Sequence, residues 1–403
     1  MPLTVMPLGV RCNLQCGYCY EDPMRDAGNL GDPRYDLDAI KRSIAKHSRA
    51  DELFLLFGGE PLLLPKPVLA DLWAWGMQRS GRNSIQTNGV LIDDEHIALF
   101  KRYNVAVGLS MDGPGELNDA RWDHTLERTR VSTARSEQAI ETLIAHDLVP
   151  SLIVTLHRVN ASPPRLETLI DWFRYLERIG VRRIGIHLME VENQAMREKY
   201  LLSSDETAYA LRRLRAARKQ LSAVTMTLIE DLELLLLGRD AKAKCIWQAC
   251  DPYTTRPVRG VDGQGERNKC SRVNKDGVDY LSTEREGFER YLALYQTPQD
   301  AGGCQGCRFF LMCRGQCPGT AIGGDWRNRS EQCPTWTEVF TEIEAELVAK
   351  GITPLSLRVD RLEVEAELMR RWEAGQNPPV EHVIRTLRER RQNSARSQPT
   401  RIA

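Results

Sequence analysis

The sequence has no excess of charge of either sign. Its 403 residues include 55 Lys and Arg against 55 Asp and Glu, so the formal net charge is zero. A general nucleic-acid binder carries a basic excess or stripe, and the balance argues against such a partner. Hydrophobic residues make up 42% and charged residues 27%, which is ordinary for a globular protein and unlike a long disordered chain.

The chain also lacks any run close to the roughly 20 apolar residues of a membrane helix. The richest short run, 232–237, contains Glu233. The apolar stretch 1–10 has no basic flank and continues directly into Arg11 and Cys12. It therefore predicts a strand and not a signal peptide. We expect a cytoplasmic protein with no membrane partner.

Cysteine is absent from residues 20–244, although the chain contains 11. Three cysteines fall within residues 12–19 and the other eight between 245 and 333. An odd number of thiols without a secretory signal fits a disulfide framework poorly. Clustered thiols in a reducing compartment predict metal binding.

The first two hundred residues alternate between short apolar runs and helical periods. We predict strands at 2–8, 52–57, 84–86, 105–109, 150–156 and 183–188. Predicted helices lie between them, at 36–47, 65–78, 93–103, 132–146 and 163–179. Six alternations indicate an α/β fold with a parallel sheet and outer helices, a partial (β/α)6 TIM-like barrel. Such folds carry their chemistry on loops at the carboxyl ends of the strands.

After this core, which we assign to residues 1–200, the chain changes character. Residues 201–243 are mostly helical and are interpreted as a bridge. Residues 244–340 are rich in Gly, Cys and Arg with little periodicity, so they need another source of stability, such as metal. Residues 341–403 form a C-terminal extension with a mobile polar tail. Helices in this half are predicted at 337–349, 355–372 and 380–391.

Cys12, Cys16 and Cys19 form the pattern C-x3-C-x2-C directly after the first predicted strand. Three thiolates in one tight loop can hold three irons of a [4Fe–4S] cubane, which normally takes four. No fourth cysteine follows within two hundred residues, so one iron would stay open to a substrate. The alternative is a zinc site with His47 or His96 as a fourth ligand, although neither has the spacing of a ligand.

The cysteine pattern, with Tyr18 between its last two cysteines, resembles the signature of the radical S-adenosylmethionine (SAM) superfamily. Three later loops agree with it, each after a predicted strand. Gly58-Gly59-Glu60-Pro61 resembles the segment that holds the amino group of SAM. Thr87-Asn88-Gly89 follows the third strand, and Ser110-Met111-Asp112-Gly113-Pro114 resembles the segment whose serine lies near the SAM ribose. Each motif alone could be a simple turn.

This resemblance covers roughly residues 1–190 and implies a set of cofactor-binding residues. They are Tyr18, Gly58, Gly59, Glu60, Pro61, Asn88, Ser110, Asp112 and Arg121. Arg121 lies near the place where related enzymes carry an arginine for the SAM carboxylate, but its spacing departs slightly, so a solvated arginine is an alternative. The implied chemistry is reductive cleavage of SAM to a 5′-deoxyadenosyl radical, which removes hydrogen from an unactivated C–H bond.

The eight later cysteines include C-x2-C-x5-C-x3-C from Cys304 to Cys317. This resembles the SPASM extension of radical SAM enzymes, which carries two auxiliary [4Fe–4S] clusters. By position, the resemblance assigns the first auxiliary cluster to Cys245, Cys250, Cys270 and Cys317. It assigns the second auxiliary cluster to Cys304, Cys307, Cys313 and Cys333. Three clusters then use every cysteine. The alternatives are a pair of zinc ribbons, or an auxiliary cluster with one open iron.

SPASM-containing enzymes mostly modify peptides. The resemblance therefore predicts an oxidoreductase that installs a crosslink or related C–H modification in a ribosomally made precursor peptide (RiPP) or protein. It also predicts an external electron donor of the flavodoxin or ferredoxin type. A second interpretation is a sulfatase maturase that forms formylglycine, but those relatives carry an Asp where this chain has Ser271. A third is a non-catalytic iron–sulfur protein that carries electrons.

Three residues are candidate acid–base groups: Asp251 after a predicted cluster ligand, and His187 and Glu190 at the end of the sixth strand. A packed histidine and a surface carboxylate are alternatives for the last two. Many relatives begin with a winged-helix domain that grips a leader peptide, and we expect none before Cys12. The arginine-rich segment 385–401 is a candidate grip for an acidic peptide, or else a solvated helix face.

Overall fold

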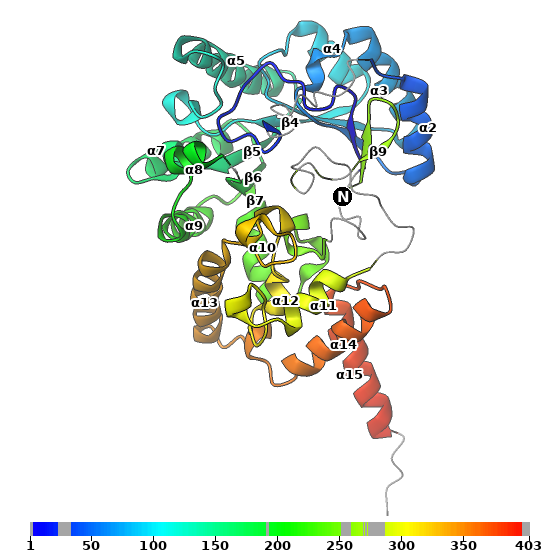
Figure 1. Ribbon diagram of the computed structural model, residues 1–403. Coiled ribbons are helices and arrows are strands. Elements are labelled where there is room, and N and C mark those ends of the chain that lie inside the picture. Colours follow the sequence, from blue (N-terminus) through cyan, green and yellow to red (C-terminus); the bar gives the residue numbers. More distant parts are fainter. Residues whose placement is uncertain are drawn as a thin grey trace, which may run out of the picture. The chain divides into compact units, whose positions relative to one another are not determined.

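The computed structural model describes residues 3–22, 34–190, 193–250, 259–268, 270, 272 and 287–396. The chain divides into two compact units (Figure 1). The first unit comprises residues 1–229 and 258–280, and the second comprises residues 230–257 and 281–403. The chain therefore leaves the first unit and returns to it once. The four-part division proposed from the sequence stays a prediction.

The first unit is built on one nine-stranded sheet in the order β7-β6-β5-β4-β3-β2-β1-β8-β9. The six predicted strands are confirmed as β1 (Leu3–Met6), β2 (Phe54–Leu56), β3 (Asn83–Thr87), β4 (Val105–Ser110), β5 (Ser151–Leu156) and β6 (Arg183–Leu188). The strands that the sequence did not predict are β7 (Thr225–Met226), β8 (Gly260–Asp262) and β9 (Arg267–Asn268). Neighbouring strands are parallel, except that β8 and β9 are antiparallel, and the sheet is not closed.

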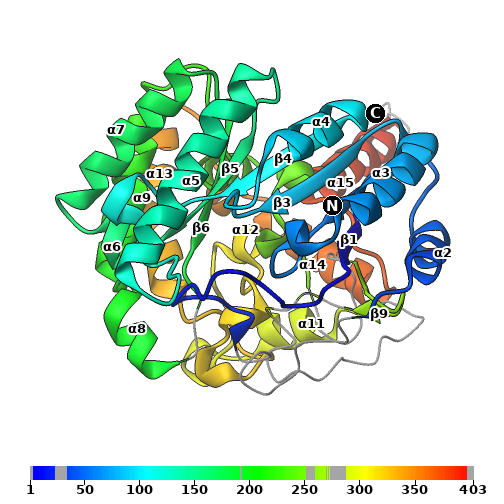
Figure 2. The same cartoon turned by 90° about the horizontal axis from the view of Figure 1, so that it is seen from above.

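Helices cover the outside of this sheet (Figure 2). They are α2 (Leu37–His47), α3 (Lys66–Ser80), α4 (Asp94–Arg102), α5 (Leu126–Ala145), α6 (Arg158–Ala161), α7 (Arg165–Arg178), α8 (Gln194–Tyr200) and α9 (Ser204–Arg218). Helix α5 begins before the predicted residue 132, because the Thr125 side chain accepts a hydrogen bond from the Arg128 N–H and caps a polar first turn. The predicted apolar face of α7, which includes Leu169 and Phe173, is fully buried.

The topology places the loops of interest at one edge. Strands β1 to β6 are parallel and follow one another across the sheet, so their carboxyl ends share an edge. The segments 7–22, 57–61, 88–89, 111–118 and 157–160 all leave the sheet there. Each motif of the predicted cofactor site lies in or beside one of these segments.

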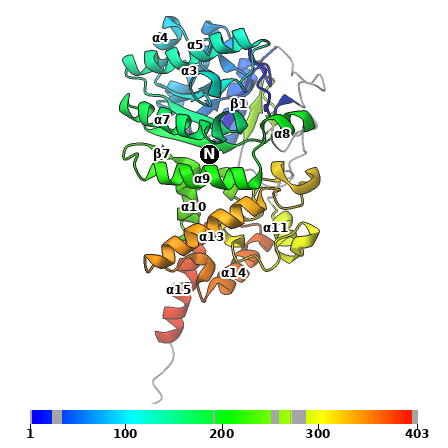
Figure 3. The ribbon, with the colours of Figure 1, turned by 90° about the vertical axis from the view of Figure 1, so that its left-hand side faces the viewer.

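The second unit combines helices with irregular loops (Figure 3). Its interior contains the buried aromatic side chains Trp247, Trp336, Phe340 and Trp372. Its helices are α10 (Thr227–Leu236), which begins in the first unit, α11 (Glu289–Gln296), α12 (Phe310–Cys313), α13 (Cys333–Ala349), α14 (Arg361–Glu373) and α15 (Val380–Arg396). The ring of Trp247 packs edge-on against Trp336 at 4.9 Å and against Phe340 at 5.7 Å. Helix α13 begins at Cys333, ahead of the predicted residue 337, because Pro334 is compatible with a first helical turn.

Arginines of α15 make ion pairs with α14. Arg391 contacts Asp360 at 3.4 Å and also pairs with Glu363, while Arg390 lies 3.3 Å from Glu367. Two of the arginines that we considered as a binding site for an acidic peptide are therefore paired with carboxylates of the chain itself. Among the described residues, no helix combines the length and the apolar character needed to span a lipid bilayer.

Candidate functional site

The loop after β1 carries the first three cysteines and is fastened to the segment after β4. The Gln15 N–H donates to the Trp122 carbonyl at 2.7 Å, and the Gly17 N–H donates to the Ala120 carbonyl at 2.9 Å. A side chain at Gly17 would meet the ring of Tyr200 at 2.7 Å, so the loop passes too close to this ring for any larger residue. The loop, which we call the cysteine loop (residues 12–19), is therefore held at the sheet edge.

Cys12 lies in a largely buried position with donors around its sulfur. The Leu14 N–H approaches the sulfur at 3.4 Å and the Asn88 side-chain amide at 3.9 Å. Burial raises the pKa of the Cys12 thiol to about 11, and the charges of Glu60 and Cys19 act in the same direction. A thiolate here is costly without a bound cation, and N–H groups directed at sulfur suit an iron ligand. The site therefore fits an iron–sulfur cluster.

The glycine pair after β2 allows two loops to touch. Gly58 has a φ of +110°, and a side chain at Gly59 would lie 1.9 Å from the Arg11 carbonyl oxygen. The Gly59 N–H donates to the Gly9 carbonyl at 3.0 Å, which joins the end of β2 to the end of β1. Glycine is required at both positions.

Glu60 is buried, and its carboxylate is occupied by the protein itself. It accepts hydrogen bonds from the Leu62 N–H at 3.0 Å, the Thr87 hydroxyl at 2.7 Å and the Asn88 N–H at 2.8 Å. Burial raises its pKa, and these three hydrogen bonds oppose the rise. The carboxylate therefore joins the ends of β2 and β3, and Pro61 begins the short turn that follows.

Ser110 ends β4 and accepts a hydrogen bond from the Gln86 side-chain amide at 2.8 Å. Gly108 makes room for that side chain, because an added Cβ would lie 2.2 Å from the Gln86 Oε1. The sequence did not single out Gln86. Its only signal is a long polar side chain inside a strand, between Ile85 and Thr87.

Asp112 is completely buried at the centre of a polar cluster. One carboxylate oxygen accepts from the Thr155 N–H at 2.8 Å. The other accepts from the Tyr18 hydroxyl and lies 3.4 Å from the His157 Nε2, while the nearest Arg121 nitrogen is 4.0 Å away. Burial alone would raise the pKa of this carboxyl, but His157 and Arg121 hold it below its ordinary value. We call Tyr18, Asp112, Arg121 and His157 the Asp112 cluster.

The sequence singled out three members of the Asp112 cluster and missed His157. This histidine follows β5 in the same way that the predicted motifs follow β2, β3 and β4. Its neighbour Asn160 donates to the Asp112 carbonyl at 2.8 Å. The pattern H-x2-N at a strand end was the available signal, and it is too short to stand out.

His187 and Glu190 come together at the end of β6 through an arginine that the sequence did not single out. Arg272 donates to a Glu190 carboxylate oxygen at 3.0 Å and lies 3.2 Å from the His187 Nδ1. Its guanidinium also lies 5.3 Å from the ring centre of Tyr20. The second Glu190 oxygen is buried and has no hydrogen-bond partner among the described residues. The third candidate, Asp251, lies outside the described residues, as does Ser271.

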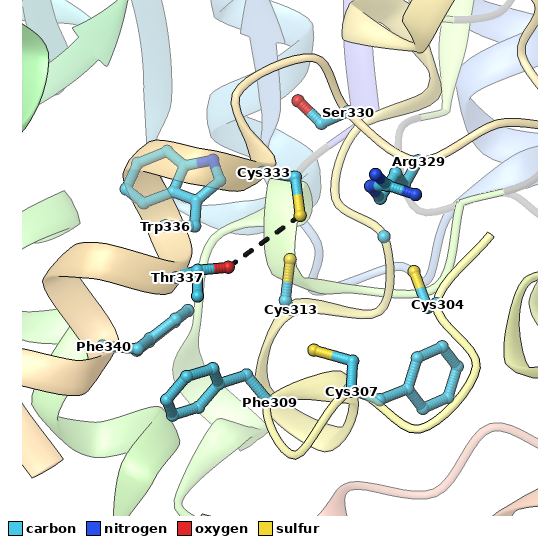
Figure 4. Close-up of a pocket in the computed structure, with 12 residues that line it drawn as sticks. Cys304, Cys307, Phe309, Cys313, Arg329, Ser330, Cys333, Trp336, Thr337 and Phe340 are labelled. Carbon is cyan, nitrogen blue, oxygen red and sulfur yellow. Dashed lines mark hydrogen bonds between the residues drawn. The ribbon is translucent and has the colours of Figure 1, made fainter. Parts of the chain in front are cut away.

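Four cysteines of the second unit line one small pocket (Figure 4). They are Cys304, Cys307, Cys313 and Cys333, and they share the pocket with Phe309, Phe310, Trp336 and Phe340. Burial raises the pKa of the Cys304 thiol to about 12 and that of Cys313 well above its ordinary value, and the neighbouring thiols add to both shifts. Cys304 is buried and the other three cysteines are partly exposed. Four thiols around one cavity with aromatic walls fit a closed iron–sulfur cluster. We call this the four-thiol pocket.

Sharp turns bring these thiols together. Helix α12 ends at Cys313, because Arg314 and Gly315 follow with φ values of +51° and +72°. Gly303 precedes Cys304, and a side chain there would lie 2.0 Å from the Thr297 carbonyl oxygen. Local backbone geometry, and not a regular sheet, therefore builds the pocket.

The other four late cysteines are divided between the units. Cys245, Cys250 and Cys317 belong to the second unit, whereas Cys270 belongs to the first. Within the described ranges, no three His, Cys, Asp or Glu side chains are arranged to hold a single metal ion. A cubane spreads its thiolates around four irons, so its ligands line a cavity and need not meet at one point.

Comparison with known proteins identifies the class of the first unit. Residues 6–163 match the family profile described as the Radical SAM superfamily. The chain therefore contains a radical SAM enzyme domain, which implies a [4Fe–4S] cluster and SAM. The resemblance deduced from the motifs is confirmed.

The curated relatives include sulfatase-maturating enzymes. The serine-type anaerobic sulfatase-maturating enzyme of Klebsiella aerogenes is 30% identical over 210 residues, which is 50% of each chain. A cysteine-type enzyme of Clostridium perfringens is 31% identical over 128 residues, 30% of this chain and 35% of that one. The chain thus spans at most about half the length of these relatives.

Solved structures share the fold over more of the chain. Native anSMEcpe with bound AdoMet and Cp18Cys peptide has a TM-score of 0.64 at 18% identity, covering 87% of this chain and 98% of that one. Streptococcus suis SuiB bound to precursor peptide SuiA has a TM-score of 0.55 at 14% identity, covering 83% and 76%. The predicted α/β fold is confirmed.

Proposed function

We propose that this chain is a radical SAM/SPASM enzyme that holds three [4Fe–4S] clusters and modifies a peptide. The observation that carries the proposal is the position of the cysteine loop, fastened to the sheet edge where the other three SAM motifs end. Cys12, Cys16 and Cys19 are the proposed ligands of the first cluster. When bound, this cluster supplies the electron that cleaves SAM and yields the radical that removes hydrogen from the substrate.

Arg121 is the proposed anchor for the SAM carboxylate. Burial is the main influence on the pKa values of Cys12 and Glu60 and raises both, but the Arg121 charge acts on each in the opposite direction. The Arg121 Nη1 donates to the Tyr18 hydroxyl at 2.9 Å, so this positive charge lies beside the cysteine loop. The backbone of Gly58 to Pro61, the Asn88 amide and the Ser110 hydroxyl are the proposed contacts for the rest of SAM.

The later cysteines are the proposed ligands of two auxiliary clusters. The four-thiol pocket supports one of them directly, since all four ligands line one cavity. Cys245, Cys250, Cys270 and Cys317 are proposed for the other. Four thiolates leave no open iron, so both sets suit electron transfer better than substrate binding.

Glu190 is the proposed proton acceptor, with His187 beside it. Loss of hydrogen from the substrate, followed by loss of one electron, releases a proton that a nearby base must take. The geometry supports this role, because Arg272 holds one Glu190 oxygen and the other has no hydrogen-bond partner among the described residues. Asp251 remains a further candidate by its position in the sequence.

A ribosomally made peptide is the proposed substrate, and a crosslink or related C–H modification is the proposed product. Two solved structures of the same fold contain a bound peptide, Cp18Cys in anSMEcpe and SuiA in SuiB, which supports this class. An external flavodoxin-like or ferredoxin-like protein is the proposed electron donor. A neighbouring precursor gene would name the peptide.

Formylglycine formation is a second candidate. The curated relatives named as sulfatase-maturating enzymes favour it. The residue after Cys270 opposes it, because this chain has Ser271 where the resemblance expects an Asp. The two candidates share cofactors and differ in the product.

The test of activity is anaerobic reconstitution with iron and sulfide, followed by reduction in the presence of SAM. We expect about twelve iron atoms per chain from three cubanes and release of 5′-deoxyadenosine. Reconstituted protein that never yields 5′-deoxyadenosine would support a non-catalytic iron–sulfur protein. Bound zinc in place of iron would contradict the proposal.

The test of substrate is incubation with candidate peptides and mass spectrometry. A crosslink and the oxidation of Ser to formylglycine both remove two hydrogens, so mass alone does not separate them. An aldehyde-reactive hydrazine labels formylglycine and leaves a crosslink unlabelled. Fragmentation across the modified residues then locates the new bond.

A further inference from the structure

We infer that Asp112 is a positioning residue, which orients Arg121 and fixes the cysteine loop through Tyr18. The inference rests on the proposed function, because it concerns the same SAM site. It changes the role of Asp112, which the resemblance gave only as a cofactor-binding residue. In the structure, both oxygens of the Asp112 carboxylate accept hydrogen bonds from groups of the protein itself.

The Asp112 backbone and side chain are fixed from several sides. Its N–H donates to the Asn118 side-chain oxygen at 2.9 Å, and its carbonyl accepts from the Asn160 amide at 2.8 Å. One carboxylate oxygen is bonded to the Thr155 N–H at the end of β5. The carboxylate thus has one orientation, set by segments that follow β4 and β5.

The other carboxylate oxygen reaches the cysteine loop. It accepts from the Tyr18 hydroxyl, and Tyr18 stands between two of the three cysteines of the loop. The Tyr18 ring is buried against Ala120, Met189 and Tyr200. The hydrogen bond and the packing of the ring together hold the residue that lies between two of the proposed cluster ligands. Asp112 therefore connects the sheet to the cysteine loop.

Arg121 completes the cluster. Its Nη1 donates to the Tyr18 oxygen at 2.9 Å, so the Tyr18 hydroxyl donates to Asp112 and accepts from Arg121. The Arg121 side chain is 12% exposed and the Asp112 side chain 0%. A buried guanidinium needs a nearby negative charge, and Asp112 supplies it. The described part of the chain gives the other two guanidinium nitrogens no hydrogen-bond partner, so they can bind a carboxylate ligand.

The role is distinct from that of a SAM ligand. All the contacts of the Asp112 carboxylate described above are to protein groups, and it has no exposed surface. Its removal would act on SAM only through Arg121 and through the position of the loop. Asn has almost the same size as Asp but carries no negative charge. Its amide nitrogen is a donor, so it cannot accept the hydrogen bond that one of the Asp112 oxygens accepts.

The test compares Asp112→Asn and Tyr18→Phe with a matched control, Glu52→Gln. Glu52 pairs with Arg259 in the same unit, but both residues precede their strands and lie at the opposite edge of the sheet. The readouts are iron content, equilibrium binding of SAM to the oxidised reconstituted protein, and the electron paramagnetic resonance spectrum of the reduced cluster with and without SAM. None of them requires turnover.

We expect Asp112→Asn to keep its iron, to weaken SAM binding about tenfold or more, and to reduce the spectral change that SAM causes. Tyr18→Phe, which removes one hydroxyl, should weaken binding less, and Glu52→Gln should match the unaltered protein. If Asp112→Asn does not fold, the SAM binding and the spectrum of Tyr18→Phe test the inference in its place. Unaltered SAM binding and spectra in the variants would overturn the inference, provided that the unaltered protein yields 5′-deoxyadenosine. Failure of the unaltered protein to do so would instead overturn the proposed function.

Discussion

The cysteine loop and the four-thiol pocket place thiols in two different ways. The cysteine loop lies at the edge of a sheet whose strands and helices are fixed without it. In the four-thiol pocket, the thiols line a cavity whose walls include the aromatic rings of Phe309, Phe310, Trp336 and Phe340. The comparison teaches that the proposed first cluster would bind at the edge of a regular sheet, whereas the proposed auxiliary cluster would bind among aromatic side chains of an irregular unit.

The largest expected effect concerns the cysteine loop. Cys12→Ala removes one proposed ligand and should abolish 5′-deoxyadenosine formation, with a loss of up to about four iron atoms per chain. The melting of the first unit should not change, because the sheet does not depend on the thiol. Product analysis and a calorimetric scan check both statements. A large loss of folded protein would contradict the view that the sheet is complete without the metal.

The matching change in the four-thiol pocket should have the opposite profile. Cys313→Ser should also lower the iron content by up to about four, but 5′-deoxyadenosine should still form while the modified peptide is lost. The second unit should become more sensitive to protease, since the proposed cluster would no longer fill the cavity between the aromatic side chains. Limited proteolysis of Cys313→Ser, compared with that of Cys12→Ala, tests this prediction. Equal protease resistance of the two variants would remove the distinction between the sites.

A buried ion pair gives the next largest effect, confined to the second unit. Arg314 and Asp240 are 1% and 3% exposed, and Asp240 also accepts from the Val380 N–H at 2.7 Å. Asp240→Asn leaves the guanidinium buried without its partner charge and should destabilise the unit by about 3–5 kcal/mol. Chemical denaturation, monitored by Trp fluorescence, measures this change in the free energy of unfolding.

The exposed pair of Asp325 and Arg327 in the same unit provides the control. Asp325→Asn should cost less than about 1 kcal/mol, because solvent screens this pair. If Asp240→Asn and Asp325→Asn lowered the free energy of unfolding equally, burial of the pair of Arg314 and Asp240 would be unimportant.

The smallest effect is a dependence on pH. Burial raises the pKa of Asp231 to about 6, although the Lys244 N–H opposes the shift. The stability that its protonated form contributes is present in acid and is lost as the pH rises toward and through 6. Asp231→Asn should therefore stabilise the protein by about 1–2 kcal/mol at pH 7.5 and by less at pH 5. Urea unfolding of both proteins at pH 7.5 and pH 5 measures this stabilisation. A stabilisation that is larger at pH 5 than at pH 7.5 would contradict the prediction.

The sequence predicted the six main strands because most are short apolar runs that alternate with helical periods, although β3 has only Ile85 as an apolar residue. It missed β7, β8 and β9, which have only two or three residues and show no period. It could not place His157 or Gln86, since a single polar residue at a strand end has many structural explanations. These residues acquire meaning only when parallel strands bring their ends together.

The grouping of the late cysteines came from resemblance and not from any local pattern. Four of them share a pocket, as the proposed ligand set requires, while their role as ligands stays a prediction. The assignment of Asp251 was untestable in the described residues. Arg272 was invisible to pattern reading, because nothing in the sequence connects it with residues more than eighty positions earlier.

The return of the chain to the first unit limits how the enzyme can be divided. Strand β8 pairs with β1 in parallel, with Thr4 opposite Gly260 and Val5 opposite Val261. A fragment that stopped at residue 229 would leave the amide and carbonyl groups of β1 open along a bare flank, which invites pairing between molecules. It would also lack Arg272. The two units are therefore unsuited to separate expression, and an ancestor of this chain that consisted of the sheet alone would have needed another way to cover that flank.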